Sequence, residues 1–318
     1  MEGYDECFHE RISKEPASKM FYRTQRRLTD LPEKYPWAKS VIVAVSRQGQ
    51  YKVPEGLEGH IGKHYLFDGR ENTESQEFQR NAAMDMFLQE LGFKTTANRN
   101  FGAVGLRWAA MKAGLGIVRK NNFFYTESGS WVELEAWITD KEMELIESND
   151  LPPCPEGCTN CIKACPTCSL SSPYTMNPVS CISYLTTFGG RDLPNDPLSK
   201  DFETWIYGCD ACQNACPMNK GKWEEKDDFP GILELSPYLT PENILTMEEE
   251  FYKQNIQPKF FYLSPDELWK WKVNTLNFMR NNYKESYGPY IIEASQNGYE
   301  KIRDMAQVIR REMNRIPV

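Results

Sequence analysis

The sequence lacks any long uninterrupted run of apolar residues. A membrane-spanning helix needs about 18 to 20 such residues in a row, so we expect no membrane span and no membrane partner. The first residues, Met1–Arg11, are polar and charged, and we expect no signal peptide. Together these absences favour a cytoplasmic protein.

An excess of basic residues is also missing. The 318 residues include 37 Lys and Arg against 45 Asp and Glu, a formal net charge of −8. Domains that bind nucleic acid are usually basic, so the balance argues against such a partner. A local basic groove on an acidic protein keeps RNA binding open.

The chain is rich in cysteine over a short stretch. Hydrophobic residues make up 40% of the chain and aromatic residues 13%, which is enough to build a folded core. Nine of the ten cysteines lie between Cys154 and Cys216, and Cys7 stands apart. In a reducing compartment this distribution indicates metal ligands rather than disulfides.

Apolar periodicity predicts an α+β fold for the first 150 residues. We expect Phe78, Ala82, Met86 and Leu91 to form one apolar stripe on a helix that Gly92 ends. The predicted helices span 1–40, 76–91 and 106–113, and the predicted strands span 40–46 (buried), 122–125 and 131–138 (alternating), with a helix or loop over 139–147.

Composition divides the chain into three parts. Leu151-Pro152-Pro153 marks a boundary, so we expect a first domain over 1–150, a cysteine-rich module over 151–220 and a helical region over 221–318. Ser264-Pro265-Asp266-Glu267 is typical of a helix start. The helices predicted in the last part cover 264–284 and 300–313, and the proline-rich segment 221–264 wraps other elements.

The cysteines form two similar groups. A bacterial two-cluster ferredoxin has the run C-x2-C-x2-C-x3-C-P, in which the fourth cysteine binds the other cluster. The spacing therefore predicts two 4Fe–4S clusters that exchange one ligand. The groups are Cys154-x3-Cys158-x2-Cys161-x3-Cys165-Pro166, and Cys181 with Cys209-x2-Cys212-x3-Cys216-Pro217; the predicted ligand sets are Cys154, Cys158, Cys161, Cys216 and Cys165, Cys181, Cys209, Cys212.

The spacing has a chemical reason and one irregularity. Three thiolates from one tight turn reach three irons, and the proline after the last cysteine ends the turn. Structural zinc is the alternative, but it leaves the paired C-x3-C-P endings unexplained. Cys154 is followed by three residues rather than two and is the least secure ligand. We expect Cys168 to be a free thiol, with substitution for Cys154 as the alternative, and Cys7 to be a bystander.

Two stretches around the second group resemble the epoxyqueuosine reductase family. They are CISYLTT at Cys181–Thr187 and YGCDACQNACPMN at Tyr207–Asn219, similar to C-I-S-Y-L-T and Y-G-C-D-x-C-Q-x-x-C-P-x-N in that family. The resemblance covers roughly residues 40–295. Upstream, Ala113–Gly116 (AGLG), Lys120-Asn121, Gly129–Trp131 (GSW) and Ile138–Asp140 (ITD) occur in the same order as in the family.

The resemblance implies a nitroreductase-like domain that binds cobalamin, with two clusters that pass electrons to the cobalt. In the family, this corrinoid then drives removal of an epoxide oxygen from a modified tRNA base, and reductive dehalogenases are related. It implies an oxidoreductase with an external electron donor such as flavodoxin or ferredoxin. The implied corrinoid contacts are Gly114, Gly116, Lys120, Gly129, Ser130, Trp131, Ser183 and Tyr184. The alternative for the three glycines is ordinary turns and helix caps.

The sequence departs from the family where the substrate is expected. The family has an acid about a dozen residues before A-G-L-G, and counting back reaches Asn100, which cannot donate a proton as a carboxylic acid does. Arg119 stands where the family has glycine. The candidate replacement donors are Tyr65, Tyr125 and His64, and Arg119 or Lys120 would make a tyrosine more acidic. The alternatives are a core residue for Tyr125 and a structural or exposed residue for His64.

The last third of the chain bears on the substrate. Residues 217–318 contain 14 Lys and Arg against 16 Asp and Glu, which argues mildly against tRNA. We therefore expect a corrinoid- and 4Fe–4S-dependent reductase with an unassigned substrate. The alternatives are a true tRNA epoxyqueuosine reductase, a non-enzymatic iron–sulfur electron carrier or corrinoid-reducing protein, and a reductive dehalogenase.

Overall fold

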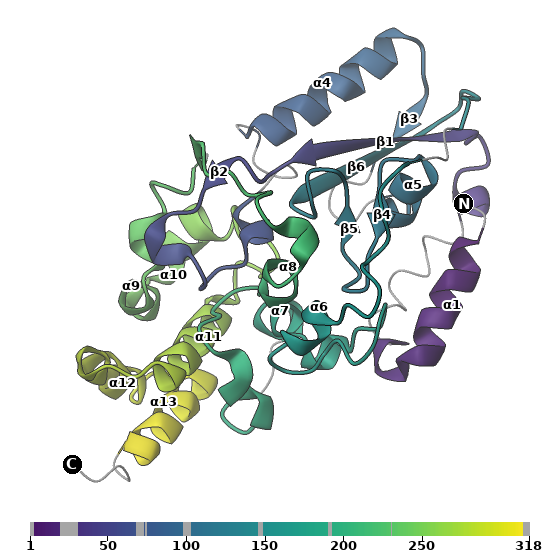
Figure 1. Ribbon diagram of the computed structural model, residues 1–318. Coiled ribbons are helices and arrows are strands. Elements are labelled where there is room, and N and C mark those ends of the chain that lie inside the picture. The colour runs from purple at the N-terminus through teal and green to yellow at the C-terminus, as the bar shows by residue number, and fades with distance from the viewer. Residues whose placement is uncertain are drawn as a thin grey trace.

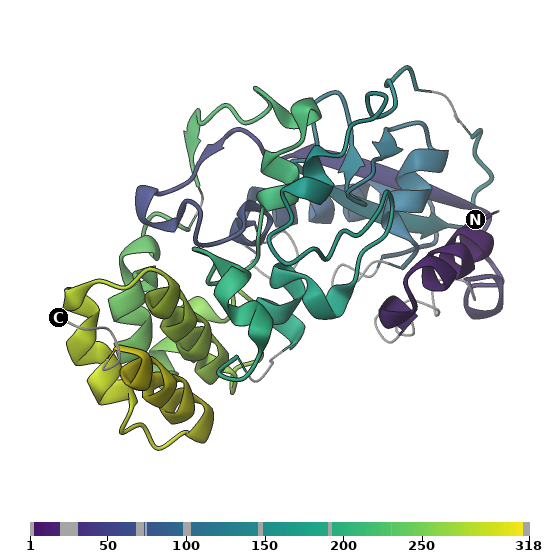
Figure 2. The same cartoon turned by 60° about the horizontal axis from the view of Figure 1, so that its bottom comes forward.

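The computed structural model describes residues 3–19, 31–67, 73, 75–97, 103–145, 149–189, 193–229 and 231–313. These residues fold into a sheet region, a cysteine-rich segment and a group of C-terminal helices. Figures 1 and 2 show the cysteine-rich segment between the other two regions, with the N-terminus and C-terminus at opposite ends of the molecule.

An antiparallel sheet has the strand order β1-β6-β3. β1 (Ser40–Arg47) pairs with β6 (Val132–Thr139) along its whole length, and β3 (Thr95–Thr96) pairs with the end of β6. Both long strands were predicted. β1 is half-buried rather than buried, because it is an edge strand of this sheet. The expected alternation in β6 is absent over its second half, which is buried at every residue.

Two short strand pairs complete the strands that the structure describes. β4 (Ile117–Val118) and β5 (Phe124–Tyr125) form an antiparallel hairpin, of which the sequence predicted only the second strand. β2 (Tyr51–Lys52) pairs in parallel with β7 (Asp227–Asp228), and so joins the first third of the chain to the segment that follows the cysteines.

The predicted N-terminal helices form with different limits. Residues 1–40 contain α1 (Tyr4–Lys14), a 3-10 turn over Pro16–Ser18 and α3 (Leu31–Lys34), while 1–2 and 20–30 lie outside the described residues. α5 (Leu106–Lys112) is as expected. Residues 140–145 contain no helix, so the loop alternative holds for them.

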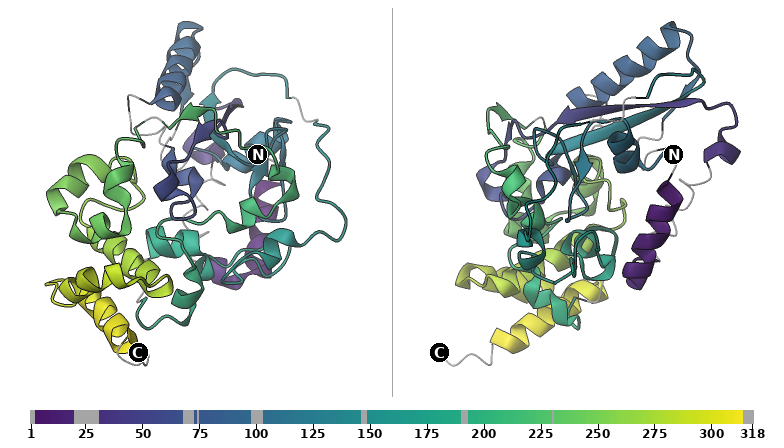
Figure 3. Two further views of the ribbon diagram at one scale, coloured as in Figure 1. Left: turned by 60° about the vertical axis from the view of Figure 1, so that its left-hand side comes forward. Right: turned by 45° about the vertical axis from the view of Figure 1, so that its right-hand side comes forward.

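The long helix α4 (Gln76–Glu90) has the predicted ends, but its apolar stripe is partly exposed. Ser75 caps its first turn by accepting the N–H of Phe78, and Gly92 ends it with φ +74°. Met86 and Leu91 of this stripe are 59% and 54% exposed. Figure 3 shows the reason, because α4 projects beyond the body of the molecule over much of its length.

The cysteine-rich segment contains only short regular elements. Its α-helices have three or four residues each, in agreement with the prediction that few long periodic segments occur there. They are α6 (Asn160–Lys163), α7 (Ile182–Tyr184) and α8 (Ala211–Asn214).

The C-terminal region is helical, as predicted. α11 begins four residues after the expected start at Ser264, because the Ser264 hydroxyl and N–H bond the carboxylates of Asp266 and Glu267 in a turn before the helix. Among the described residues, none of the helices combines the length and the apolar character needed to cross a bilayer. The helices are α9 (Pro241–Thr246), α10 (Glu249–Phe251), α11 (Leu268–Asn281), α12 (Gly288–Ala294) and α13 (Glu300–Met313).

The main hydrophobic core crosses the predicted domain boundaries. Buried side chains from Tyr51–Phe67 pack in one cluster with those of α11, α12 and α13. At its centre the ring of Tyr207 stacks on Trp271, with ring centroids 4.7 Å apart. A smaller core lies under the sheet. The mixed helices and strands agree with the α+β prediction, while the nitroreductase-like fold and the division at 150 and 220 stay predictions.

Neighbouring isoleucines on α12 test this core. Ile291 is fully buried and Ile292 is 50% exposed. We expect Ile291→Ala to lower the free energy of unfolding by about 2 to 5 kcal/mol, because it leaves a cavity, and Ile292→Ala to change it by less than about 1 kcal/mol. Urea denaturation followed by circular dichroism measures both. Equal losses would contradict the packing described for α12.

Candidate metal centre

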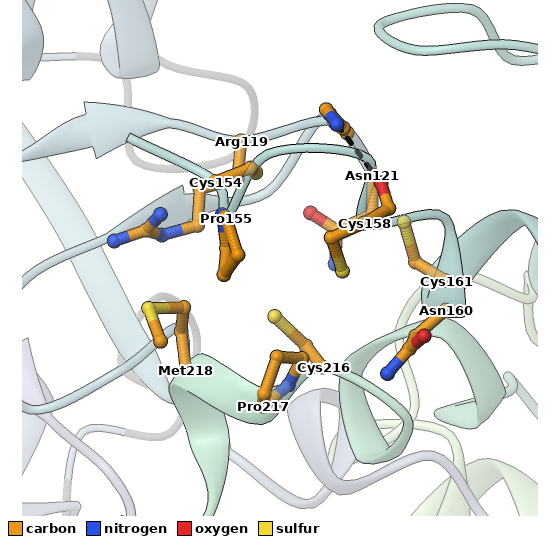
Figure 4. A pocket seen from close by; sticks show the side chains of 11 residues that line it. Arg119, Asn121, Cys154, Pro155, Cys158, Asn160, Cys161, Cys216, Pro217 and Met218 are labelled. Carbon is orange, nitrogen blue, oxygen red and sulfur yellow. Dashed lines mark hydrogen bonds between the residues drawn. The ribbon is translucent and has the colours of Figure 1, made fainter. Parts of the chain in front are cut away.

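Four cysteines from the two sequence groups line one pocket (Figure 4). Cys154, Cys158 and Cys161 come from the first group and Cys216 from the second. These are the four residues that the ferredoxin spacing assigns to one cluster. The other lining residues are Arg119, Lys120, Asn121, Pro155, Asn160, Pro217 and Met218.

A tight turn accommodates the irregular spacing after Cys154. Gly157 adopts φ +66°, a left-handed conformation that glycine reaches without strain. The Cys158 N–H then donates to the Pro155 carbonyl at 3.1 Å, and α6 begins two residues later. The extra residue is therefore absorbed in the turn, and Cys154 still faces the pocket.

The second thiol group consists of Cys165, Cys181, Cys209 and Cys212. Burial raises the pKa of the Cys209 thiol, and the Cys181 and Cys165 thiols raise it further. Burial likewise raises the pKa of Cys212, with contributions from the other three. Because such electrostatic effects weaken with distance, these four thiols lie together, as the ferredoxin pattern predicts.

The donor chemistry fits iron–sulfur clusters. A thiol with a raised pKa keeps its proton at neutral pH, whereas only the thiolate binds metal. Iron replaces those protons and compensates for the charge that burial disfavours. Among the described residues, no three Cys, His, Asp or Glu side chains are close enough to hold a single metal ion. The individual ligand assignments stay predictions.

The two thiol groups are neighbours. Cys161 of the first group contributes to the raised pKa of Cys212 in the second, and α6 packs beside α8. Cys168 is exposed and does not line the pocket, while Cys154 does. Cys7 is half-buried on α1. The structure thus gathers the eight expected cysteines in two adjacent sets.

A buried amide network joins the loop before β6 to the second cysteine motif. The Ser130 N–H donates to Asn219 Oδ1 at 2.8 Å, and Ser130 Oγ accepts from Gln213 Nε2 at 2.7 Å and from Asn219 Nδ2 at 2.8 Å. A Cβ on Gly129 would lie 2.6 Å from Asn219 Oδ1, and φ is +84° there. Protein contacts therefore explain both Gly129 and Ser130.

Other predicted corrinoid contacts also have protein partners. Gly114 ends α5 with φ +69°, and a Cβ on Gly116 would lie 2.1 Å from the Tyr125 carbonyl oxygen within the hairpin. Lys120 Nζ donates to the Cys158 carbonyl at 2.8 Å. The Trp131 ring packs edge-on against Trp223. A corrinoid role for these residues stays a prediction.

Ser183 and Tyr184 lie in a more open setting beside Cys181. The hydroxyls of Tyr65 and Ser183 are hydrogen-bonded at 2.5 Å. Tyr65 contacts the Tyr262 ring, which contacts Phe188, and Phe188 in turn contacts Tyr184. Phe188 is 43% exposed. These side chains form a partly exposed aromatic wall next to the second thiol group, which suits a large flat cofactor.

The predicted proton donors differ in their environments. Tyr125 is fully buried, its hydroxyl accepts from Asn121 Nδ2, and burial together with Cys216 raises its pKa. The prediction that a nearby cation makes this tyrosine more acidic is wrong, because burial dominates. Burial also raises the pKa of Tyr65. The His64 ring lies edge-on to Tyr65. Asn100 lies outside the described residues.

Sequence reasoning overlooked Asp210. Its buried carboxylate accepts the Lys63 N–H at 2.9 Å. Burial raises the pKa of Asp210 to about 6, while the hydrogen bond and the charge of Lys63 act in the opposite direction. The position was visible in the motif, between Cys209 and Cys212, but its burial depends on residues far away in the sequence.

Residues 154–219 match a family model described as a 4Fe-4S double cluster binding domain. The match spans both cysteine groups and supports iron–sulfur clusters over structural zinc.

Curated relatives extend the similarity beyond the cysteines. An epoxyqueuosine reductase of Gloeobacter violaceus is 29% identical over 221 residues, which cover 67% of this chain and 68% of that protein. One of Listeria monocytogenes is 39% identical over 138 residues, or 41% of this chain and 35% of that protein. The chain thus aligns with 68% of the length of the first relative and 35% of that of the second.

Solved structures share the fold. The epoxyqueuosine reductase of Streptococcus thermophilus has a TM-score of 0.72 at 22% identity and covers 96% of this chain and 84% of its own. An epoxyqueuosine reductase with an epoxyqueuosine-modified tRNA-Tyr stem loop has a TM-score of 0.68 at 21% identity, over 90% and 80% of the two chains.

Two glycines test the amide network. Gly92 and Gly129 both have positive φ, but a Cβ at Gly92 meets nothing within 4 Å. We expect Gly92→Ala to cost about 1 kcal/mol of unfolding free energy through backbone strain. Gly129→Ala also disrupts buried amides and should cost about 1 to 3 kcal/mol more. Urea denaturation compares the variants, and equal losses would show that Gly129 is not packed against Asn219.

Proposed function

The chain belongs to the epoxyqueuosine reductase family, and we propose that it reduces epoxyqueuosine in tRNA to queuosine with two 4Fe–4S clusters and a corrinoid. The reaction consumes two electrons and two protons and releases the epoxide oxygen as water. The prediction that the chain is an oxidoreductase is confirmed by its membership of this family.

One observation supports the proposal most strongly. Eight cysteines gather in two adjacent sets within a segment that matches a double-cluster domain. Neighbouring clusters can relay electrons one at a time, and two such transfers supply the two electrons of the reduction. The electron donor remains as the sequence suggests, a small carrier such as flavodoxin or ferredoxin.

The expectation of an unassigned substrate is wrong. The curated relatives are epoxyqueuosine reductases, and a structure of the same fold holds an epoxyqueuosine-modified tRNA stem loop. The charge count over 217–318 misled because a total does not say where the cations lie on the surface. tRNA therefore replaces the unassigned substrate as the proposed partner.

The aromatic wall beside Cys181 is where we propose that the corrinoid binds. Ser183 and Tyr184 from the predicted set, together with Tyr65 and Phe188, would hold it there. When bound, the corrinoid supplies a strongly reducing cobalt centre. Other residues predicted to contact the corrinoid are bonded to protein groups instead. Ser130, for example, holds the sheet region against the cluster module.

Tyr65 is the proton donor that the geometry favours. Its hydroxyl is protonated at neutral pH, and a hydrogen bond to Ser183 orients it beside the aromatic wall. Tyr125 has no exposed surface and faces the first thiol group. We therefore assign Tyr65 to proton transfer and Tyr125 to the packing of the cluster site.

Iron content tests the ligand sets. We expect the reconstituted chain to hold about eight irons, as two 4Fe–4S clusters require. Cys154→Ser should lose up to about four of them, because it removes a ligand of the first cluster, whereas Cys168→Ser should retain all. Colorimetric iron and sulfide analysis with EPR measures this. Iron loss in the Cys168 variant alone would exchange the roles of the two cysteines.

Queuosine formation tests the function. We expect the chain to restore queuosine in tRNA of a strain that lacks its own reductase, as measured by mass spectrometry of tRNA nucleosides. With purified protein, Tyr65→Phe should lower the rate by about 10²- to 10⁴-fold, the usual contribution of a general acid.

Tyr238→Phe is the matched control, since Tyr238 is exposed outside the cysteine segment and should keep the full rate. Accumulation of epoxyqueuosine in a strain that makes the cluster-loaded protein would refute the proposed substrate.

A further inference from the structure

Arg119 is a buried cation at the first thiol group. Its side chain is only 3% exposed and lines the same pocket as Cys154, Cys158, Cys161 and Cys216. Figure 4 shows it at the edge of the pocket beside Cys154 and Pro155. In the part of the chain that the structure describes, its Nε and Nη1 atoms have no hydrogen-bond partner.

The guanidinium lies against an aromatic ring, in a pocket that the four thiols and Lys120 also line. Its central carbon lies 5.1 Å from the centre of the Tyr125 ring. Arg119 and Cys154 both act on the Tyr174 hydroxyl: burial and Cys154 raise the pKa of Tyr174, and Arg119 lowers it. Arg119 and Cys154, the thiol that the spacing made least secure, therefore both lie within electrostatic reach of the Tyr174 hydroxyl and line the same pocket.

A buried arginine has few ways to remove its charge. Its guanidinium stays protonated in proteins, and an unpaired buried ion costs several kcal/mol. Four thiolates around an iron–sulfur core supply a compensating negative charge in the same pocket. The second thiol group differs, because the residue that directly follows its Cys209 is a buried carboxylic acid, Asp210.

We propose that Arg119 is the counter-charge of the cluster held by Cys154, Cys158, Cys161 and Cys216, and that it raises the reduction potential of that cluster above that of the second. Reduction adds one negative charge to the cluster, and a nearby cation stabilises the reduced form. The first electron from a donor is then held at this cluster. The inference rests on the two clusters of the proposed function.

Redox titration of the iron-loaded full-length chain, followed by low-temperature EPR, tests this role. We expect Arg119→Gln to make one of the two reduction steps at least tenfold less favourable, a negative shift of about 59 mV or more for one electron. The other step should stay in place. Arg119→Lys keeps the charge and should keep both potentials near those of the unaltered protein.

Two further variants make the comparison decisive. Arg119→Met preserves the stem that packs on Tyr125 and replaces Arg119→Gln if the latter does not load its clusters. Arg311→Gln removes an exposed cation on α13, and both potentials should stay unchanged. An unshifted potential in the neutral Arg119 variants, or an equal shift of both steps, would overturn the role of Arg119.

The titration needs neither tRNA nor corrinoid. If the chain does not form queuosine, the reduction potentials of the Arg119 variants still test the role of Arg119. Conversely, the unaltered chain could form queuosine while the Arg119 variants show unshifted reduction potentials. The proposed function would then stand, and the role of Arg119 would not.

Discussion

Deprotonation of buried thiols is the constraint on which the cysteine-rich segment depends. Its α-helices have three or four residues, too few to hold their shape in water alone. Burial raises the pKa of Cys181, Cys209 and Cys212 and thereby favours the neutral thiol. A cluster reverses this preference, so metal binding and folding of the segment are coupled. The main hydrophobic core is linked to that coupling, because Ile182, Leu185 and Tyr207 of the segment pack in it.

The sheet region supports the two cysteine groups through buried contacts. Ser130 meets Gln213 and Asn219, and Asn121 reaches the Cys212 carbonyl at 3.3 Å. Each of these contacts joins the hairpin region to the backbone or side chains around a cysteine motif. A shift of the hairpin would therefore alter the environment of the thiols. A residue that the resemblance assigns to cofactor binding, such as Ser130, therefore also has a structural role beside the cysteine motifs.

The sequence predicted the parts of the site that depend on local spacing. The eight cysteines, α4, α5, α11, α13 and both long strands follow from patterns within a few residues of each other. Burial is not local, and the sequence pattern did not reveal it. Met86 and Leu91 project into solvent because α4 leaves the body of the molecule. Tyr125 resists ionisation because distant segments cover it. The charge count did not predict the proposed substrate, because the distribution of surface charge depends on the same long-range packing.

The shared core of Tyr51–Phe67 and the C-terminal helices has a consequence for synthesis on the ribosome. Leu57 and Ile309 belong to one core but are 252 positions apart in the chain. At about 5 to 20 residues per second, the apolar segment waits roughly 13 to 50 seconds for its last partners to emerge. During that interval it is a ready target for chaperones, and the molecule cannot be completed one domain at a time.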